Sequence, residues 1–156
     1  MRYSLSDFMS QFPNEDACFR YIYERKYKNK KCPKCKRVGM YYRNAAKPIY
    51  VCACGKSHIS LYKGTIFENA KLPVNKWFLI IYLTAMGLYD SAEIQRTVGL
   101  SQLTSWKIQK KLFKIMAENV KDRHHLSQWK QQVEANYRYR VFPENMNLYL
   151  STYQFR

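Results

Sequence analysis

The first 29 residues predict a single helix. Asn14 precedes two acidic residues, and an amide N-cap followed by carboxylates suits the positive end of a helix dipole. Cys18 and Ile22 lie four residues apart on one face of that helix, so we expect Cys18 to pack in the core rather than bind metal. Residues 4–13 predict a polar start that ends in a turn.

Between residues 30 and 67 the pattern changes to short apolar runs separated by turn residues. The runs at residues 40–42, 49–51 and 59–62 have the residue types and lengths of short strands. Two closely spaced pairs of cysteines flank the first two of these runs. The segment therefore predicts a small unit of β-hairpins.

After Gly64 the apolar positions follow helical spacing. Pro73 opens a helix over residues 74 to about 86, whose nearly all-round apolar surface predicts that other elements surround it. Gly87 ends this helix. Two more helices are predicted, over residues 91–98 and from residue 101 to about 119.

The order of these patterns predicts an α+β protein with four segments. An N-terminal helical segment (1–29) precedes a β ribbon (30–67), and a helical unit (68–120) precedes a connector with aromatic strands (121–156). The aromatic residues in the last segment alternate with polar ones. We expect this segment to form a small sheet or to join a second copy or another protein.

Composition narrows the class of protein. The chain has 156 residues, of which 47% are hydrophobic and 24% are charged, and its net charge is +16. Such an excess of positive charge favours a polyanionic partner, most simply nucleic acid. No apolar run is long enough to cross a bilayer, and the N-terminus lacks the apolar core of a signal peptide. We therefore expect no membrane partner, a cytoplasmic location and reduced cysteines.

The two cysteine pairs predict a metal site. Cys32 and Cys35 are separated by Pro-Lys, and Cys52 and Cys54 follow after sixteen residues. Two thiolate pairs on tight turns, joined by a hairpin, can close a tetrahedral site around Zn²⁺. Neighbouring lysines favour thiolate over thiol. The ribbon is therefore expected to be a zinc ribbon, which gains much of its folding free energy from the metal.

Alternatives to four thiolates remain open. The second pair has only one residue between its sulfurs, where zinc turns usually have two to four. His58 follows four residues after Cys54 and is the alternative fourth ligand. A site without metal is the third possibility. Redox chemistry at Cys32 and Cys35 fits less well, because that motif normally begins a helix in an α/β domain.

Basic residues concentrate around the first cysteine pair. Residues 20–37 contain nine basic residues and one acidic residue, with tyrosines among them. A solvated basic face is one interpretation, and contact with DNA phosphates is the other. The candidate phosphate contacts are Lys30, Lys31, Lys34, Lys36 and Arg37.

The two helices at residues 91–119 have the pattern of a helix-turn-helix. Gly99 suits the turn, Ser101 is the N-cap of the second helix, and the predicted buried contacts are Ile94, Val98, Leu103 and Ile108. The second helix of such a pair enters the major groove. The candidate DNA contacts are therefore Ser101, Gln102, Thr104, Ser105, Lys107, Lys110 and Lys111. An ordinary helical hairpin with a lysine-rich solvent face is the alternative.

The order of motifs resembles the N-terminal half of Merlin-type insertion-sequence transposases. The motifs that match are Phe8, Phe12-Pro13-Asn14-Glu15, Cys32-Pro-Lys-Cys35, Tyr50-Val-Cys52, Cys54, Gly64-Thr-Ile-Phe67, Lys71-Leu-Pro73, Trp77, Leu100-Ser-Gln and Thr104-Ser-Trp106. The resemblance implies a zinc ribbon and a helix-turn-helix that recognise the ends of a mobile element. It also implies an RNase-H-like domain that cuts and joins DNA with acidic residues and two metal ions.

The catalytic part of this resemblance departs from the family pattern. The family's first catalytic aspartate lies in a strand that here corresponds to Val133-Glu-Ala-Asn-Tyr137, so Asn136 takes its place. A neutral amide neither offsets the charge of a metal ion nor helps to ionise its water. The sequence given continues for only 20 residues beyond this position. Residues 121–156 are therefore expected to be a degenerate start of the RNase-H-like region, with no catalytic residues.

Three functions follow as hypotheses. The first is a zinc-dependent, transposase-derived protein that binds double-stranded DNA without catalysis. The second is a truncated transposase subunit that acts in DNA transposition. The third is a zinc-ribbon module that binds protein or RNA.

Overall fold

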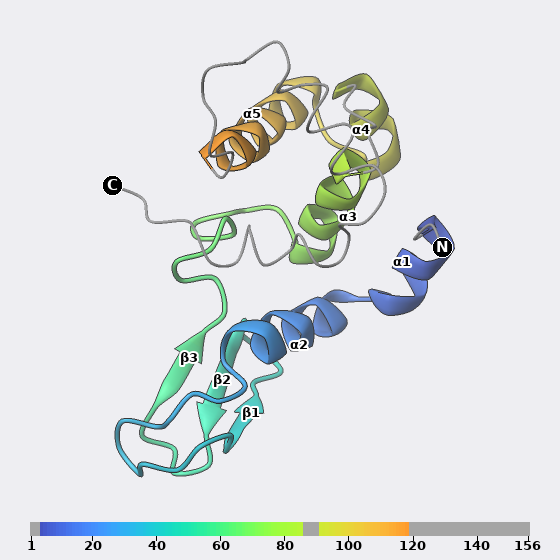
Figure 1. Cartoon of the computed structure of the whole chain (residues 1–156). Coiled ribbons are helices and arrows are strands. Elements are labelled where there is room, and N and C mark those ends of the chain that lie inside the picture. Colours follow the sequence, from blue (N-terminus) through green and yellow to red (C-terminus); the bar gives the residue numbers. More distant parts are fainter. Residues whose placement is uncertain (1–3, 86–90, 119–156) are drawn as a thin grey trace.

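The computed structural model describes residues 4–85 and 91–118 of the chain. Within them lie five helices and a three-stranded antiparallel sheet, which confirms the predicted α+β class (Figure 1). The elements in chain order are α1 (Leu5–Gln11), α2 (Glu15–Lys26), β1 (Tyr41–Arg43), β2 (Ile49–Cys52), β3 (His58–Ser60), α3 (Val74–Ala85), α4 (Ser91–Val98) and α5 (Gln102–Glu118). None of the helices in these two ranges is long and apolar enough to cross a membrane.

The N-terminal part holds two helices where one was predicted. Helix α1 occupies the stretch expected to be a polar start, because Ser4 and Asp7 form a capping box: the Asp7 N–H donates to Ser4 Oγ (3.1 Å), and the Ser4 N–H donates to Asp7 Oδ2 (2.7 Å). Helix α2 begins as predicted, after Asn14, whose Oδ1 accepts from the Ala17 N–H. The capping signal at Ser4 was present in the sequence, although the short helix that it starts was not predicted.

The sheet has the strand order β1-β2-β3, and its three strands match the predicted runs. One face of the sheet packs against α2. Tyr50 and Ile59 are buried on this face, and the Tyr23 ring of α2 stacks on the Tyr50 ring with centroids 4.0 Å apart. At the end of α2 the Tyr27 hydroxyl donates to the Ser60 carbonyl oxygen of β3 (3.3 Å). Helix α2 therefore covers one side of the sheet.

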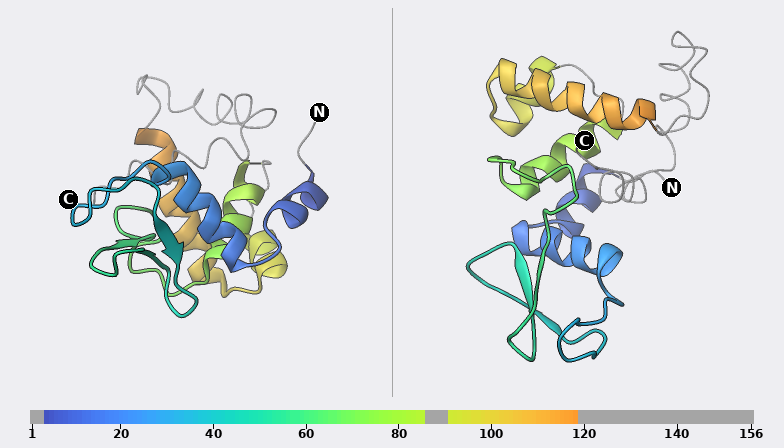
Figure 2. Two further views of the ribbon diagram at one scale, coloured as in Figure 1. Left: turned by 90° about the horizontal axis from the view of Figure 1, so that it is seen from below. Right: turned by 90° about the vertical axis from the view of Figure 1, so that its left-hand side faces the viewer.

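The opposite side of α2 faces α3, and Figures 1 and 2 show α2 between the sheet and α3. The Phe78 ring of α3 lies 5.0 Å from Phe12 and 6.1 Å from Tyr21 between centroids. The N–H of Val74, the first residue of α3, donates to Glu15 Oε1 (3.2 Å). Cys18 is fully buried here, as predicted. One continuous core thus joins α1, α2, the sheet and the C-terminal helices.

Helices α4 and α5 are joined by the short turn that the sequence predicted. Gly99 adopts the left-handed conformation (φ +75°), and its N–H donates to the Gln95 carbonyl oxygen (2.9 Å). Ser101 caps α5, because its Oγ accepts from the Thr104 N–H (3.2 Å). Gly87 and the strands predicted within residues 121–156 lie outside the described residues.

Candidate metal centre and nucleic-acid interface

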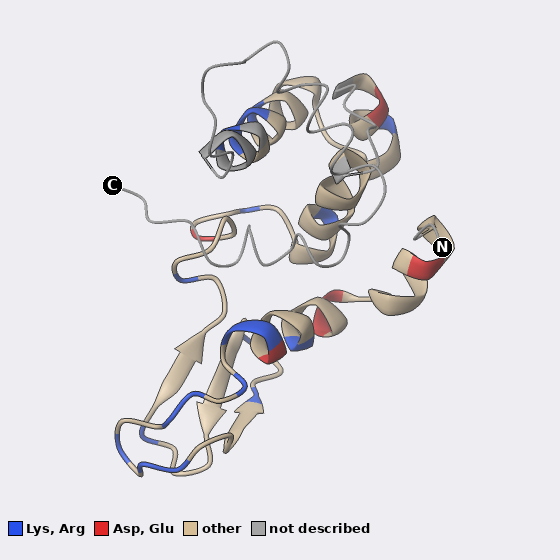
Figure 3. Cartoon of the chain, viewed as in Figure 1, with Lys and Arg blue, Asp and Glu red and all other residues tan. Residues whose placement is uncertain are grey.

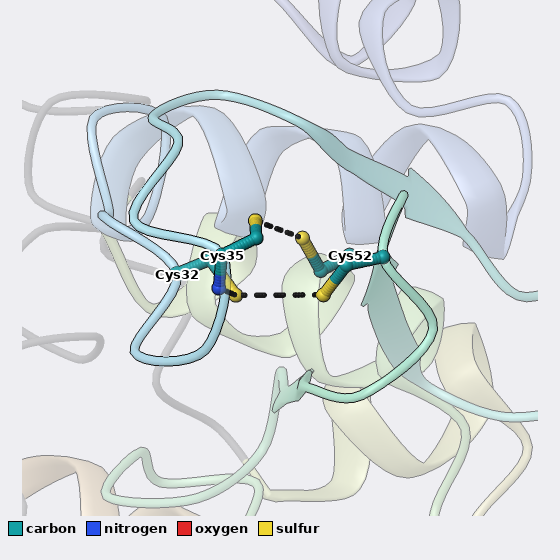
Figure 4. A group of neighbouring side chains, drawn as sticks. Cys32, Cys35 and Cys52 are labelled. Atoms are coloured by element: carbon teal, nitrogen blue, oxygen red, sulfur yellow. Dashed lines mark hydrogen bonds between the residues drawn. The ribbon is translucent and has the colours of Figure 1, made fainter.

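Two turns bring the four predicted cysteines together. Cys32 and Cys35 belong to the turn before β1, Cys52 is the last residue of β2, and Cys54 lies in the turn between β2 and β3. All four sulfur atoms lie within 4.8 Å of one another, and Figure 4 shows the sulfurs of the two turns facing each other. Cys32 and Cys52 are buried, and the other two are half-buried.

The spacing of the sulfurs fits a tetrahedral metal ion. The Sγ atoms of Cys32 and Cys54 are 3.8 Å apart, and those of Cys35 and Cys52 are 3.6 Å apart. A Zn–S bond of about 2.3 Å in tetrahedral geometry sets neighbouring sulfurs about 3.8 Å apart. A disulfide needs sulfurs about 2 Å apart, and all four cysteines are free thiols. The cluster is therefore a candidate metal site compatible with zinc.

Backbone hydrogen bonds shape both cysteine turns in the same way. The Lys36 N–H donates to the Cys32 carbonyl oxygen (3.0 Å), and the Gly55 N–H donates to the Cys52 carbonyl oxygen (2.8 Å). In each turn the residue directly after the second cysteine is left-handed, with φ +62° at Lys36 and +70° at Gly55. The shorter spacing of the second pair is therefore no obstacle to closing the cluster.

Gly55 allows a test of the second turn. We expect Gly55→Ala to lower the free energy of unfolding by about 1 kcal/mol, because an L-residue is strained at this φ although open space surrounds the position. Lys36→Gly should act in the opposite direction at the matching position of the first turn. Urea denaturation of the zinc-loaded protein measures both. An unchanged midpoint for Gly55→Ala would show that the turn does not depend on this conformation.

The first turn also sets the charge of Cys32. The Cys35 N–H lies 3.5 Å from the Cys32 Sγ, and this hydrogen bond, with a second from the Lys34 N–H, lowers the pKa of Cys32 to about 5. The Cys54 N–H acts in the same direction on Cys52, but burial and the neighbouring sulfurs raise the pKa of Cys52 to about 12. The backbone N–H groups of the first turn therefore favour the thiolate form of Cys32, which is the form of cysteine that binds metal.

His58 does not belong to the cluster. It lies on β3 with an exposed side chain, and the four sulfurs form a group that does not include it. Across residues 4–85 and 91–118, no other group of three or more cysteine, histidine or acidic side chains comes close enough to share a metal ion. The structure thus favours the four-thiolate alternative over the one with His58.

The basic residues of the first turn are exposed around the cysteine cluster. Figure 3 shows Lys and Arg gathered on the loops at this end of the sheet. The side chains predicted to contact phosphates are all exposed: Lys30, Lys31, Lys34, Lys36 and Arg37. The Lys30 ammonium lies 5.3 Å from the centre of the Tyr27 ring, so an aromatic face adjoins this positive surface.

Helix α5 exposes most, but not all, of the predicted DNA contacts. Ser101, Gln102, Thr104 and Lys107 have exposed side chains. Ser105 was predicted to be an exposed contact, and this is wrong: its side chain is fully buried, and its Oγ has no hydrogen-bond partner among the described residues. It lies on the face of α5 that carries the buried residues Ile108, Gln109 and Leu112.

Lys111 does not lie on the exposed side of α5. Its ammonium donates to the Ile66 carbonyl oxygen (3.3 Å) and lies 5.8 Å from the centre of the Trp77 ring. The side chain is half-buried, and this burial lowers the pKa of Lys111. Lys111 thus ties α5 to the segment before α3, whereas Lys110 and Lys114 are exposed.

Two large apolar side chains on α5 face solvent. Leu103 is 61% exposed, so its prediction as a core residue is wrong, while Ile94, Val98 and Ile108 are buried as predicted. Trp106 is 52% exposed, and the Lys110 ammonium lies 4.9 Å from the centre of its ring. The exposure of Leu103 was not predicted, although Leu103 lies four residues before Lys107, a spacing that places the two on the same side of the helix.

No protein-family model, curated protein or solved structure matches this chain. The resemblance to Merlin-type transposases therefore stays a prediction from the sequence motifs. Inferences about function depend on the cysteine cluster, the α4–α5 pair and the charge of the chain.

Proposed function

We propose that this chain is a zinc-dependent, transposase-derived protein that binds double-stranded DNA. Its cysteine turns form a zinc ribbon, and α4 and α5 form a helix-turn-helix whose second helix enters the major groove. The motif order supports the link to transposases. The net charge of +16 supports a polyanionic partner.

Zinc would be held by Cys32, Cys35, Cys52 and Cys54, and it would supply folding free energy rather than catalysis. Four protein ligands would leave the metal no open position for a substrate. The two cysteine turns also position the exposed lysines around them. This arrangement supports a role for the ribbon in holding a phosphate backbone.

The observation that carries the proposal is the surface of α5. Its first turns expose Gln102, Thr104 and Lys107, and residues 101–117 contain no acidic residue. Polar side chains at the start of the second helix are those that reach base edges in helix-turn-helix proteins. The absence of carboxylates removes the repulsion that DNA phosphates would otherwise meet.

Binding to a random-sequence duplex, measured by fluorescence anisotropy against salt concentration, tests this proposal. We expect Lys107→Ala and Lys110→Ala each to weaken binding and to reduce the slope of log Kobs against log salt by about 1. The reason is that each lysine that neutralises a phosphate releases about one counterion.

Lys47→Ala is the matched control for charge. Lys47 is exposed in the turn between β1 and β2, at the opposite end of β2 from Cys52, so its loss should leave the slope nearly unchanged. Equal effects of all three substitutions would contradict a specific role for α5. Stronger competition by structured RNA than by duplex DNA would favour the RNA-binding hypothesis instead.

A further inference from the structure

The solvent-facing side of α5 forms a continuous stripe that changes character along the helix. Leu103 and Trp106 occupy its beginning, and the exposed lysines Lys107, Lys110 and Lys114 follow. Lys107 lies four residues after Leu103, Lys110 lies four after Trp106, and Lys114 lies four after Lys110, so these positions share one face of the helix. We call these five residues the α5 stripe.

The apolar start of the α5 stripe does not belong to the core. The core side of the same helix is occupied by Ser105, Ile108 and Leu112, all of them buried. Leu103 and Trp106 lie on the other side, with more than half of each side chain exposed. Two large apolar residues so close together on a solvent-facing surface indicate a contact with a partner.

Charge identifies the kind of partner. Three exposed lysines continue the same stripe, and no carboxylate lies on α5 before Glu118. A surface that combines lysines with an apolar end is complementary to a nucleic acid, which offers both phosphates and base surfaces. A second copy of this basic chain would meet the stripe with like charge.

We propose that the α5 stripe reads thymine, with Leu103 in contact with the C5-methyl groups that thymine presents in the major groove. The thymine methyl is the apolar group that the four bases offer on the major-groove edge. Gln102, exposed beside Leu103, carries the amide that pairs with adenine on the same edge. Trp106 packs along the sugar-phosphate backbone, where Lys110 beside its ring meets a phosphate. This inference rests on the proposed function and assigns a base preference to it.

Replacing thymine by uracil tests this assignment, because it deletes the methyl group and keeps the hydrogen-bonding edge. The full chain, loaded with zinc, is first used to select duplexes from a random pool. Its affinity is then measured for one selected duplex and for the same duplex with deoxyuridine in place of thymidine. We expect T·A pairs to be enriched and each contacted methyl to contribute about fourfold to the affinity.

The Leu103→Ala variant should lose this sensitivity to uracil. Its melting temperature should stay unchanged, because Leu103 is exposed. Met9→Ala, which removes an apolar side chain that is 55% exposed on α1, should keep the full sensitivity. Low salt keeps all variants bound through phosphate contacts, so the thymine-to-uracil ratio stays measurable.

The outcomes separate the two proposals. Failure of the unmodified chain to bind duplex DNA at low salt would overturn both the proposed function and this inference. Binding that is equally tight with thymine and uracil would overturn only the inference. The inference would also be overturned if the Leu103→Ala variant kept the sensitivity to uracil. It would be overturned as well if Leu103→Ala changed the self-association of the chain, measured by sedimentation, and left the sensitivity to uracil unchanged.

Discussion

Removing the metal is expected to unfold the cysteine ribbon. A strong chelator, or the substitution Cys35→Ser, should abolish the ordered structure of residues 30–63, because the three strands are only three or four residues long and metal binding contributes on the order of 10 kcal/mol to such units. Zinc analysis should find one ion per chain before treatment. Circular dichroism and limited proteolysis measure the loss of structure, with new cleavage expected between β1 and β3.

Cys18→Ala is the matched control for the loss of a thiol. Cys18 is fully buried on α2, and burial raises the pKa of its thiol to about 12, so it is a protonated core residue away from the cluster. This variant should keep one zinc ion and lose only about 1 kcal/mol of stability. A ribbon that resists protease equally well before and after chelation would contradict a structural metal.

Replacing Phe78 by alanine is expected to cost about 3 to 5 kcal/mol of unfolding free energy. Phe78 is fully buried on α3, and its ring contacts Phe12, Tyr21 and Phe67, with the Phe67 centroid 5.8 Å away. The cavity left by this ring would lie where α1, α2 and α3 meet. Urea denaturation of the zinc-loaded protein measures the loss.

Trp106→Ala provides the comparison for removal of a large aromatic ring. Because Trp106 is 52% exposed on α5, its loss should change stability by less than about 1 kcal/mol. Phe78→Leu should recover part of the stability lost in Phe78→Ala, since it refills most of the volume. A cost below about 1 kcal/mol for Phe78→Ala would contradict the packing described for these three helices.

The sequence predicted those features that depend on short-range chemistry. Asn14 and Ser101 cap their helices because an N-cap needs only its own side chain and the next backbone amides. The cysteine cluster was predictable for a similar reason, since two turns joined by a hairpin bring paired thiols together whatever the rest of the chain does. Both features appear in the structure at the predicted residues.

Features that depend on how helices cross were predicted less well. Ser105 was predicted to face solvent because it is polar, and Leu103 was predicted to face the core because it is apolar. In the structure Ser105 is buried and Leu103 is exposed. The buried side of α5 is set by the positions of α3 and α4, and its local sign, the four-residue spacing of Leu103 from Lys107, was outweighed by residue type. Lys111 was likewise predicted to belong to the lysine-rich surface, but its ammonium donates to the Ile66 carbonyl oxygen and its side chain is half-buried.

Helix α2 precedes the sheet in the sequence, but in the structure it lies between the sheet and α3. The Tyr23 ring packs on the sheet and the Tyr21 ring packs against α3, so α2 lies between the sheet that carries the cysteine turns and the helices that follow it. In this arrangement packed structure, rather than a flexible linker, connects the cysteine ribbon to the α4–α5 pair. If both ends touch one duplex, the protein itself sets the number of base pairs between their footprints.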